Sequence, residues 1–345
     1  MKSTIELIVG LSDIPGVSGC EQAVRDEIIA LIKDHCERYE VDALGNLIAF
    51  KKGERAPLKR IMLSAHMDEV GLIVTHIEED GLLRFATVGG IDSRVLFGKA
   101  VEIGPSRLCG VIGGKAVHHL TEKEKEAVPE PESLLIDVGA TDRAEAEKHV
   151  SPGDFAVFSG GFADLGENCL MGRALDDRAG CALLVELLRS PLPYDCHFAF
   201  TVQEETGCTG AMTAAYAVAP DIGIVVETTT AADIAGVPAG KKICELGGGP
   251  VLSYMDRGTV YDKALYDLAF EIAGESGIPA QTKSAVVGGN ESRSVQAAGR
   301  GAKVLAVSLP CRYLHSPSLL IHKGDVEHTL RLLAALIQKL GGGAL

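Results

Sequence analysis

Apolar runs and amphipathic segments alternate in two parts of the chain, residues 1–70 and 161–345. Apolar runs typical of buried strands occur at 61–65, 196–205, 221–227 and 302–310. Segments with apolar residues at helical spacing occur at 21–35, 176–190, 263–277 and 325–342. This alternation predicts an α/β fold, in which helices cover both faces of a mixed, mostly parallel sheet.

Residues 71–160 follow a different pattern. Apolar and polar residues alternate from residue 71 to about 90, with a turn at Asp80-Gly81, as in an antiparallel hairpin. Several short strand-like runs follow, and polar, Pro-containing pieces separate them. We therefore expect a small β-rich, barrel-like domain, inserted into the α/β domain after the strand that ends at His66.

Two helix starts are predicted from local signals. Ser18 and Glu21 have the spacing of a capping box, which predicts a helix from residue 21. Asp325 precedes an amphipathic segment that ends in glycines, so we expect it to cap the last helix.

Composition narrows the classes of protein to which the chain can belong. The net charge is −14, and no Lys/Arg run is long enough to predict nucleic-acid binding. No apolar stretch reaches the length of a membrane span, and the first residues do not have the pattern of a signal peptide. The nine cysteines include no C-x-x-C pair, which favours reduced thiols and a cytoplasmic protein.

Residues that can bind metals cluster at the ends of the predicted strands. His66 ends one apolar run, Glu204 and Glu205 end a second, Glu227 ends a third, and His315 follows a fourth within a few residues. In open α/β sheets, ligands bind at the carboxyl ends of the strands. The pattern therefore predicts a site that gathers these side chains at one edge of the sheet.

This set of residue types, together with Asp176 before a predicted helix, suits a dinuclear metal centre. One carboxylate must bridge the two ions, and each ion needs further His or carboxylate ligands and an open position. Two histidines and three carboxylates meet that requirement. A further carboxylate that binds no metal is needed to move a proton from water to the leaving group.

Four ordered motifs, AHMDEVG, ALDDRAG, QEETGCTGA and RYLHSP, resemble those of the glutamyl and deblocking aminopeptidases. Members of that family assemble into tetrahedral particles, and some have a cellulase-like name. The resemblance covers nearly the whole chain, the inserted domain included. It implies a metal-dependent aminopeptidase that acts on short peptides and forms a large homo-oligomer through the inserted domain.

The resemblance also implies a role for each matching residue. The metal ligands would be His66, Asp176, Glu205, Glu227 and His315, with Asp176 as the bridge. Glu204 would be the general base, and Asp68 would accept the second N–H of the His66 imidazole and fix its tautomer. Asp177, by contrast, is interpreted as a charge at a helix terminus.

Two positions depart from the family pattern. The family usually has Asp where this chain has Glu227, and Gly-Gly-Thr-Asp where it has residues 288–291, which end in Asn290-Glu291. The first change should keep a metal ligand on a longer side chain. The second is expected to alter the substrate pocket more than the catalytic step.

The residues leave several alternatives open. A dinuclear-metal amidohydrolase or carboxypeptidase that acts on acyl-amino acids would need the same ligands. A glycoside hydrolase would need a carboxylate pair without metal, and a non-catalytic assembly protein would have no use for Glu204. His and carboxylate ligands suit Zn, Co or Mn, with Zn or Co favoured, and neither the side-chain preference nor the oligomer size follows from the sequence.

Overall fold

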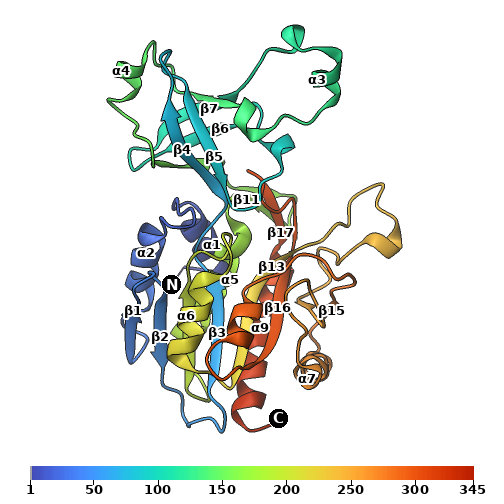
Figure 1. The fold of residues 1–345 in the computed structure, drawn as a ribbon. Helices are drawn as coiled ribbons and strands as arrows, with labels where there is room; N and C mark the ends of the chain where they lie inside the picture. The colour runs from blue at the N-terminus through green and yellow to red at the C-terminus, as the bar shows by residue number, and fades with distance from the viewer. Residues whose placement is uncertain (1) are drawn as a thin grey trace.

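The computed structural model describes residues 2–345, which form a larger α/β body with a smaller β-barrel at one end (Figure 1). The body is built on an 11-stranded sheet. Along its main path the strand order is β1 (Arg38–Val41), β2 (Leu47–Lys51), β12 (Cys196–Thr201), β3 (Ile61–His66), β13 (Ile222–Thr230), β16 (Lys303–Arg312), β17 (Leu319–His322), β11 (Cys169–Gly172) and β10 (Ala163–Leu165). Two short strands, β14 (Val251–Leu252) and β15 (Gln281–Thr282), extend from β16.

Parallel pairing is concentrated at the centre of this sheet. Strands β12, β3, β13 and β16 pair in parallel, so their carboxyl ends meet at one edge. The flanking strands pair antiparallel. The mixed sheet predicted from the sequence is thus confirmed, and its parallel core is the part that gathers the strand ends.

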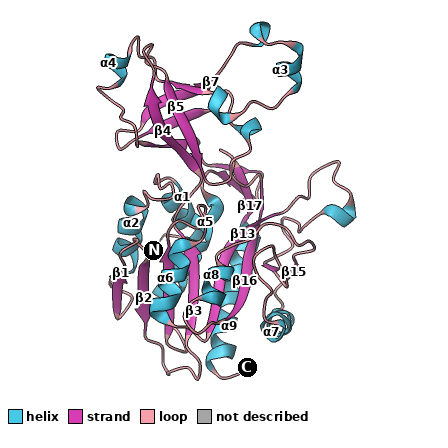
Figure 2. Ribbon diagram, viewed as in Figure 1, coloured by secondary structure: helices cyan, strands magenta, loops and turns pink. Residues whose placement is uncertain are grey.

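Helices cover both faces of the sheet, as predicted (Figure 2). One face packs against α1 (Thr4–Ser12), α2 (Gln22–Ile32), α5 (Leu175–Arg189), α7 (Lys263–Glu275) and α9 (Lys323–Gly341). The other face packs against α6 (Thr209–Val218) and α8 (Ser292–Ala297). Side chains of β3 alternate between the two layers: Leu63 joins the first and Met62 the second.

The inserted segment forms a closed barrel with a core of its own. The strand order around the barrel is β4 (Gly71–Ile77), β5 (Leu83–Val88), β8 (Leu135–Asp137), β7 (Leu108–Gly113), β6 (Ala100–Ile103) and β9 (Phe155–Phe158). Its helices are short: α3 (Glu122–Glu126) and α4 (Arg143–Ala146). Closure leaves no unpaired sheet edge, which explains how a small set of short strands forms a stable unit.

Both helices begin within three residues of the predicted positions, but both predicted caps were wrong. Helix α2 begins at Gln22 without a side-chain cap, and the Ser18 hydroxyl donates instead to Asp68 Oδ2 at 2.5 Å. Helix α9 begins at Lys323 after His322, whose Nδ1 accepts from Gly324 N. Asp325 instead accepts the amides of two residues in a distant loop, Gly247 and Gly249. In each case the residue expected to cap the helix forms a hydrogen bond with a residue far away in the sequence instead.

No helix among residues 2–345 combines the length and the apolar composition that crossing a membrane requires. The nine cysteines are all free thiols, five of them buried.

Candidate metal centre

The predicted site residues meet at the carboxyl ends of the central parallel strands. His66 is the last residue of β3 and lies beside Thr201, the last residue of β12. Glu204 and Glu205 follow β12 directly, and Glu227 lies within β13, two strands from β12. Because these strands are parallel and in register, side chains far apart in sequence share one edge of the sheet.

Asp176 lies between the two predicted histidine ligands. Its Oδ1 is 3.4 Å from His66 Nε2, and its Oδ2 is 3.5 Å from His315 Nε2. Asp176 belongs to α5, but its backbone angles and those of Asp177 are not helical. This break turns the Asp176 carboxylate toward both imidazoles, and each of its oxygens faces one of them.

Each imidazole is oriented by a backbone carbonyl. His66 Nδ1 lies 3.0 Å from the carbonyl oxygen of Asp68, and His315 Nδ1 lies 2.6 Å from that of Gly90. Donation from Nδ1 to these carbonyls leaves Nε2 with a free lone pair that faces the carboxylates. For His66 the structure differs from the expectation, because the Asp68 carboxylate lies farther away, at 3.5 Å.

The Asp68 carboxylate instead orders the turn after β12. It accepts the amide hydrogens of Glu204 and Glu205 at 3.0 and 3.1 Å, in addition to the Ser18 hydroxyl. These bonds fix the backbone from which both glutamate side chains project. Asp68 therefore acts on the site chiefly through the position of this turn.

The two glutamates differ in their surroundings. Glu205 Oε1 is 3.3 Å from His315 Nε2, whereas Glu204 Oε1 accepts from the thiol of Cys208 at 3.3 Å. Burial raises the pKa of Glu204 to about 7 and that of Glu205 to about 8. Without a metal ion nearby, Glu205 would be mostly protonated and Glu204 about half protonated at pH 7.

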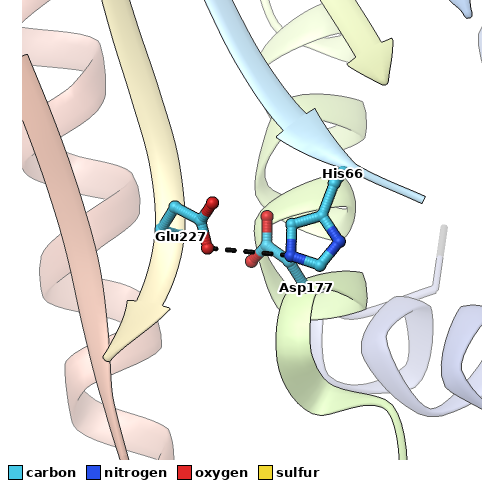
Figure 3. A group of neighbouring side chains, drawn as sticks. All are labelled: His66, Asp177 and Glu227. Atoms are coloured by element: carbon cyan, nitrogen blue, oxygen red, sulfur yellow. Dashed lines mark ion pairs between the residues drawn. The ribbon is translucent and has the colours of Figure 1, made fainter. Parts of the chain in front are cut away.

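Asp177 is closer to the site than the sequence suggested. It is fully buried, and it groups with His66 and Glu227 so that one ligand atom of each residue lies within 4.8 Å of the others (Figure 3). Its Oδ1 accepts from Gly180 N in the first turn of α5, but burial raises the pKa of this carboxyl well above its usual value, which does not favour the charged form expected from the sequence. The sequence signal for this proximity was its position next to Asp176 in the ALDDRAG motif.

The donor set fits divalent cations. Four buried carboxylate oxygens have no hydrogen-bond partner among the described residues, and three of them belong to residues grouped around His66: Asp176 Oδ1, Asp177 Oδ2 and Glu227 Oε1, the fourth being Glu291 Oε1. Burial alone would lower the pKa of His66, yet Glu227, Asp176 and Asp68 raise it well above its usual value. A site that favours positive charge this strongly, with imidazole nitrogens and carboxylates converging, suits metal binding.

The site opens into a cavity of about 470 Å³. Its wall includes Asn290 and Lys283, whereas Glu291 points away, is fully buried and accepts from Thr201 Oγ1 at 2.5 Å. The expectation that Asn290 and Glu291 both alter the pocket therefore applies only to Asn290. Sequence reasoning missed Lys283, because one lysine outside any motif gives no signal.

A larger cavity, about 630 Å³, lies near the amino end of β12 and contains none of the predicted site residues.

Known proteins resemble the chain over almost its whole length. A model of the M42 glutamyl aminopeptidase family matches residues 45–332. The lysyl aminopeptidase of Pyrococcus furiosus is 34% identical over 343 residues, which cover 97% of each chain.

Solved structures agree in fold. The TET1 peptidase of Pyrococcus horikoshii, which can assemble into a tetrahedron or a large octahedral shell, is 38% identical with a TM-score of 0.85; the match covers 97% of this chain and 99% of that one. A TET aminopeptidase from a marine sediment archaeon of the Thaumarchaeota is 32% identical with a TM-score of 0.93, over 98% and 96% of the two chains. The chain therefore belongs to the M42 glutamyl aminopeptidase family, and it is a peptide hydrolase of the aminopeptidase type.

Proposed function

We propose that this aminopeptidase uses two divalent metal ions held by the five predicted ligands. His66 and Glu227 would serve the first ion, Glu205 and His315 the second, and Asp176 would bridge them. The observation that carries the proposal is the position of Asp176, with one carboxylate oxygen 3.4 Å from His66 Nε2 and the other 3.5 Å from His315 Nε2. We favour Zn or Co, because the ligands are imidazoles and carboxylates.

Glu204 is the proposed general base. When bound, the two ions would supply Lewis-acid chemistry, polarising the scissile carbonyl and making water a stronger nucleophile. Glu204 takes a proton from the attacking water and delivers it to the leaving amine as the C–N bond breaks. Glu204 lines the same cavity as the proposed metal ligands, so its carboxylate can reach both the attacking water and the leaving amine.

Asp68 is the proposed positioning residue for this base. By accepting the amides of Glu204 and Glu205, its carboxylate fixes the proposed base and a proposed ligand relative to each other. The Ser18 hydroxyl in turn holds Asp68. Short peptides would enter through the cavity of about 470 Å³.

The barrel is the proposed assembly domain of a large homo-oligomer. It exposes large apolar side chains, among them Phe97, Val111, Val117 and Val128, each about half exposed or more. The TET1 relative assembles into shells, which supports the same behaviour here. The nine free thiols support a cytoplasmic location, where thiols stay reduced.

The test compares two neighbouring glutamates. Glu204→Gln should lower kcat at least about 1000-fold with an unchanged metal content, because a base is lost but no ligand. Glu205→Gln should lower both kcat and the metal content, because a proposed ligand is lost. Metal analysis and hydrolysis of aminoacyl p-nitroanilides would be measured on both variants. Loss of metal from Glu204→Gln equal to that from Glu205→Gln would refute the assignment, and cleavage of N-acetylated but not free peptides would favour an amidohydrolase.

A further inference from the structure

The proposed base projects from a turn whose backbone is strained at both ends. Gln203 and Cys208 flank the turn at residues 204–207, and their φ angles are +56° and +60°. Residues other than glycine adopt this left-handed region only at a cost in free energy. The amides of Gly207 and Cys208 both donate to Glu204 O at 2.9 Å, which closes the turn. A strained turn keeps its conformation only while surrounding contacts hold it in place.

Asp68 holds the middle of this turn, and Glu21 holds its start. Gln203 N donates to Glu21 Oε1 at 3.2 Å, and Gly19 N donates to the same oxygen at 2.8 Å. Glu21 directly precedes α2 and is only 5% exposed. Its carboxyl therefore ties the strained residue Gln203 to a segment 182 positions earlier in the chain.

The burial of Glu21 has a cost that its hydrogen bonds partly offset. Burial raises the pKa of this carboxyl, and the Asp68 carboxylate raises it further, whereas the amides of Gly19 and Gln203 lower it. A turn at Gly19 could be stabilised by an exposed acid without that cost. The bond to Gln203 is the contact that the interior position of Glu21 makes possible.

The side chain of Glu204 is held from the other end of the turn. Cys208 Sγ donates to Glu204 Oε1 at 3.3 Å, and among residues 2–345 no other hydrogen bond reaches this carboxyl. Burial raises the pKa of the thiol, and the nearby Glu204 raises it further, so the thiol keeps its proton and remains a donor. The other oxygen, Oε2, is left without a protein partner and can face water, as general-base catalysis requires.

We propose that Glu21 and Cys208 are positioning residues for Glu204. Glu21 fixes the backbone at the start of the turn, and Cys208 fixes the carboxyl so that Oε2 can accept a proton from the attacking water. Neither residue lines the catalytic cavity, so both act through Glu204 and not on the substrate. This inference rests on the proposed function of the site.

Conservative replacement tests the role of Cys208. Misplacing a catalytic group by about 1 Å can cost about 100-fold in rate, so the loss of one contact among several should cost about 10-fold. Cys208→Ala should therefore lower kcat about 10-fold on aminoacyl p-nitroanilides, with KM and metal content unchanged. Cys208→Ser, which restores a donor, should recover most of the loss. Cys109→Ala, at an exposed thiol of the barrel, is the control.

The same comparison tests Glu21. Glu21→Ala removes the acceptor for the Gln203 amide, and it should lower kcat about 10-fold with KM and metal content unchanged. Glu21→Gln keeps an oxygen that can accept the amide, so it should recover most of this loss. Asp26→Ala, at an exposed acid of α2, is the matched control.

A double variant tests whether Glu21 acts through the strained backbone. Glycine adopts the left-handed region without strain, so Gln203→Gly should let the turn form without the bond to Glu21. Glu21→Ala combined with Gln203→Gly should therefore regain most of the activity that Glu21→Ala loses. A double variant as slow as Glu21→Ala would overturn the role assigned to Glu21.

The remaining outcomes are equally decisive. An unchanged kcat in Cys208→Ala, or a Cys208→Ser variant as slow as Cys208→Ala, would overturn the role of Cys208. A raised KM with an unchanged kcat would mean that the residue acts on the substrate, and a metal loss equal to that of Glu205→Gln would mean that it supports a ligand. Either result would overturn the inference for that residue. The proposed function fails separately, if Glu204→Gln itself keeps the wild-type kcat.

Discussion

Replacing Glu69 with glutamine would remove the carboxylate that lies against two buried arginines next to the site. Arg173 Nη1 donates to its two oxygens at 2.7 and 2.6 Å, and Arg178 Nη2 lies 3.4 Å from Oε1. Glu69, Arg173 and Arg178 are 5%, 2% and 0% exposed. The substitution keeps the shape of the side chain but leaves two guanidinium groups buried without a negative charge.

The expected cost follows from what remains bonded. Removing one partner of a buried ion pair typically costs about 3–5 kcal/mol. The glutamine oxygen can still accept from Arg173 and from Gly16 N, which places the change at the lower end, about 3 kcal/mol. For a chain of this size, each kcal/mol lowers Tm by about 2 °C. We therefore expect Tm to fall by about 5–6 °C.

The same substitution in an exposed pair provides the control. Arg143 Nη2 lies 3.0 Å from Glu79 Oε1 on the barrel surface, where the Glu79 side chain is 90% exposed. Glu79→Gln should change stability by at most about 0.5 kcal/mol, or about 1 °C. Thermal unfolding of both variants would be followed by circular dichroism at equal protein and metal concentrations. A Tm decrease for Glu69→Gln no larger than that for Glu79→Gln would refute the reasoning.

Two further predictions follow from packing and burial. Gly180→Ala would place a Cβ 2.4 Å from Asp177 Oδ2 inside a fully buried region. The substitution should displace that carboxylate and weaken metal binding at least about 10-fold. Calorimetric titration of the metal-free enzyme with Zn²⁺ would measure the affinity, and an unchanged affinity would contradict the prediction. Burial lowers the pKa of His197 to about 4, so the unfolded chain binds the extra proton between about pH 6.5 and 4. The resulting stability is fully present above pH 6.5 and is lost as the pH falls toward 4. His197→Gln should therefore lose less stability than the wild type between pH 7 and 5 in urea unfolding, and equal losses would contradict the argument.

Sequence reasoning succeeded where chemistry coincides with strand geometry. His66, Glu204, Glu205 and Glu227 lie at or near the ends of apolar runs, and parallel pairing brings such ends together regardless of their separation along the chain. The alternation of strands and helices was sufficient to predict the layered fold for the same reason. Both inferences depend on periodicity, which a single sequence displays directly.

Sequence reasoning failed where a polar residue finds a distant partner. Ser18 has the spacing of a capping residue, yet it donates to Asp68, 50 positions away. Asp325 accepts from residues 76 and 78 positions earlier instead of capping α9. A local cap and a tertiary hydrogen bond have similar energies, so the buried partner can decide between them. No local pattern identifies that partner, and the same limit concealed Lys283.

The bond from His315 Nδ1 to Gly90 O joins residues 225 positions apart and links the barrel to the metal centre. Gly90 lies just after β5, in the loop that leads on to β6 of the same barrel. The preceding Gly89 has φ +82°, and a Cβ there would lie 2.8 Å from Val70 and 3.2 Å from the Cβ of Glu205, so only glycine fits. The barrel thus packs against Glu205, a proposed ligand of the second metal. It also orients the imidazole of His315, the other proposed ligand of that metal. A movement of the barrel relative to the body would turn His315 away from Asp176, so contacts that hold the barrel in the proposed homo-oligomer would also hold the geometry of the proposed metal site.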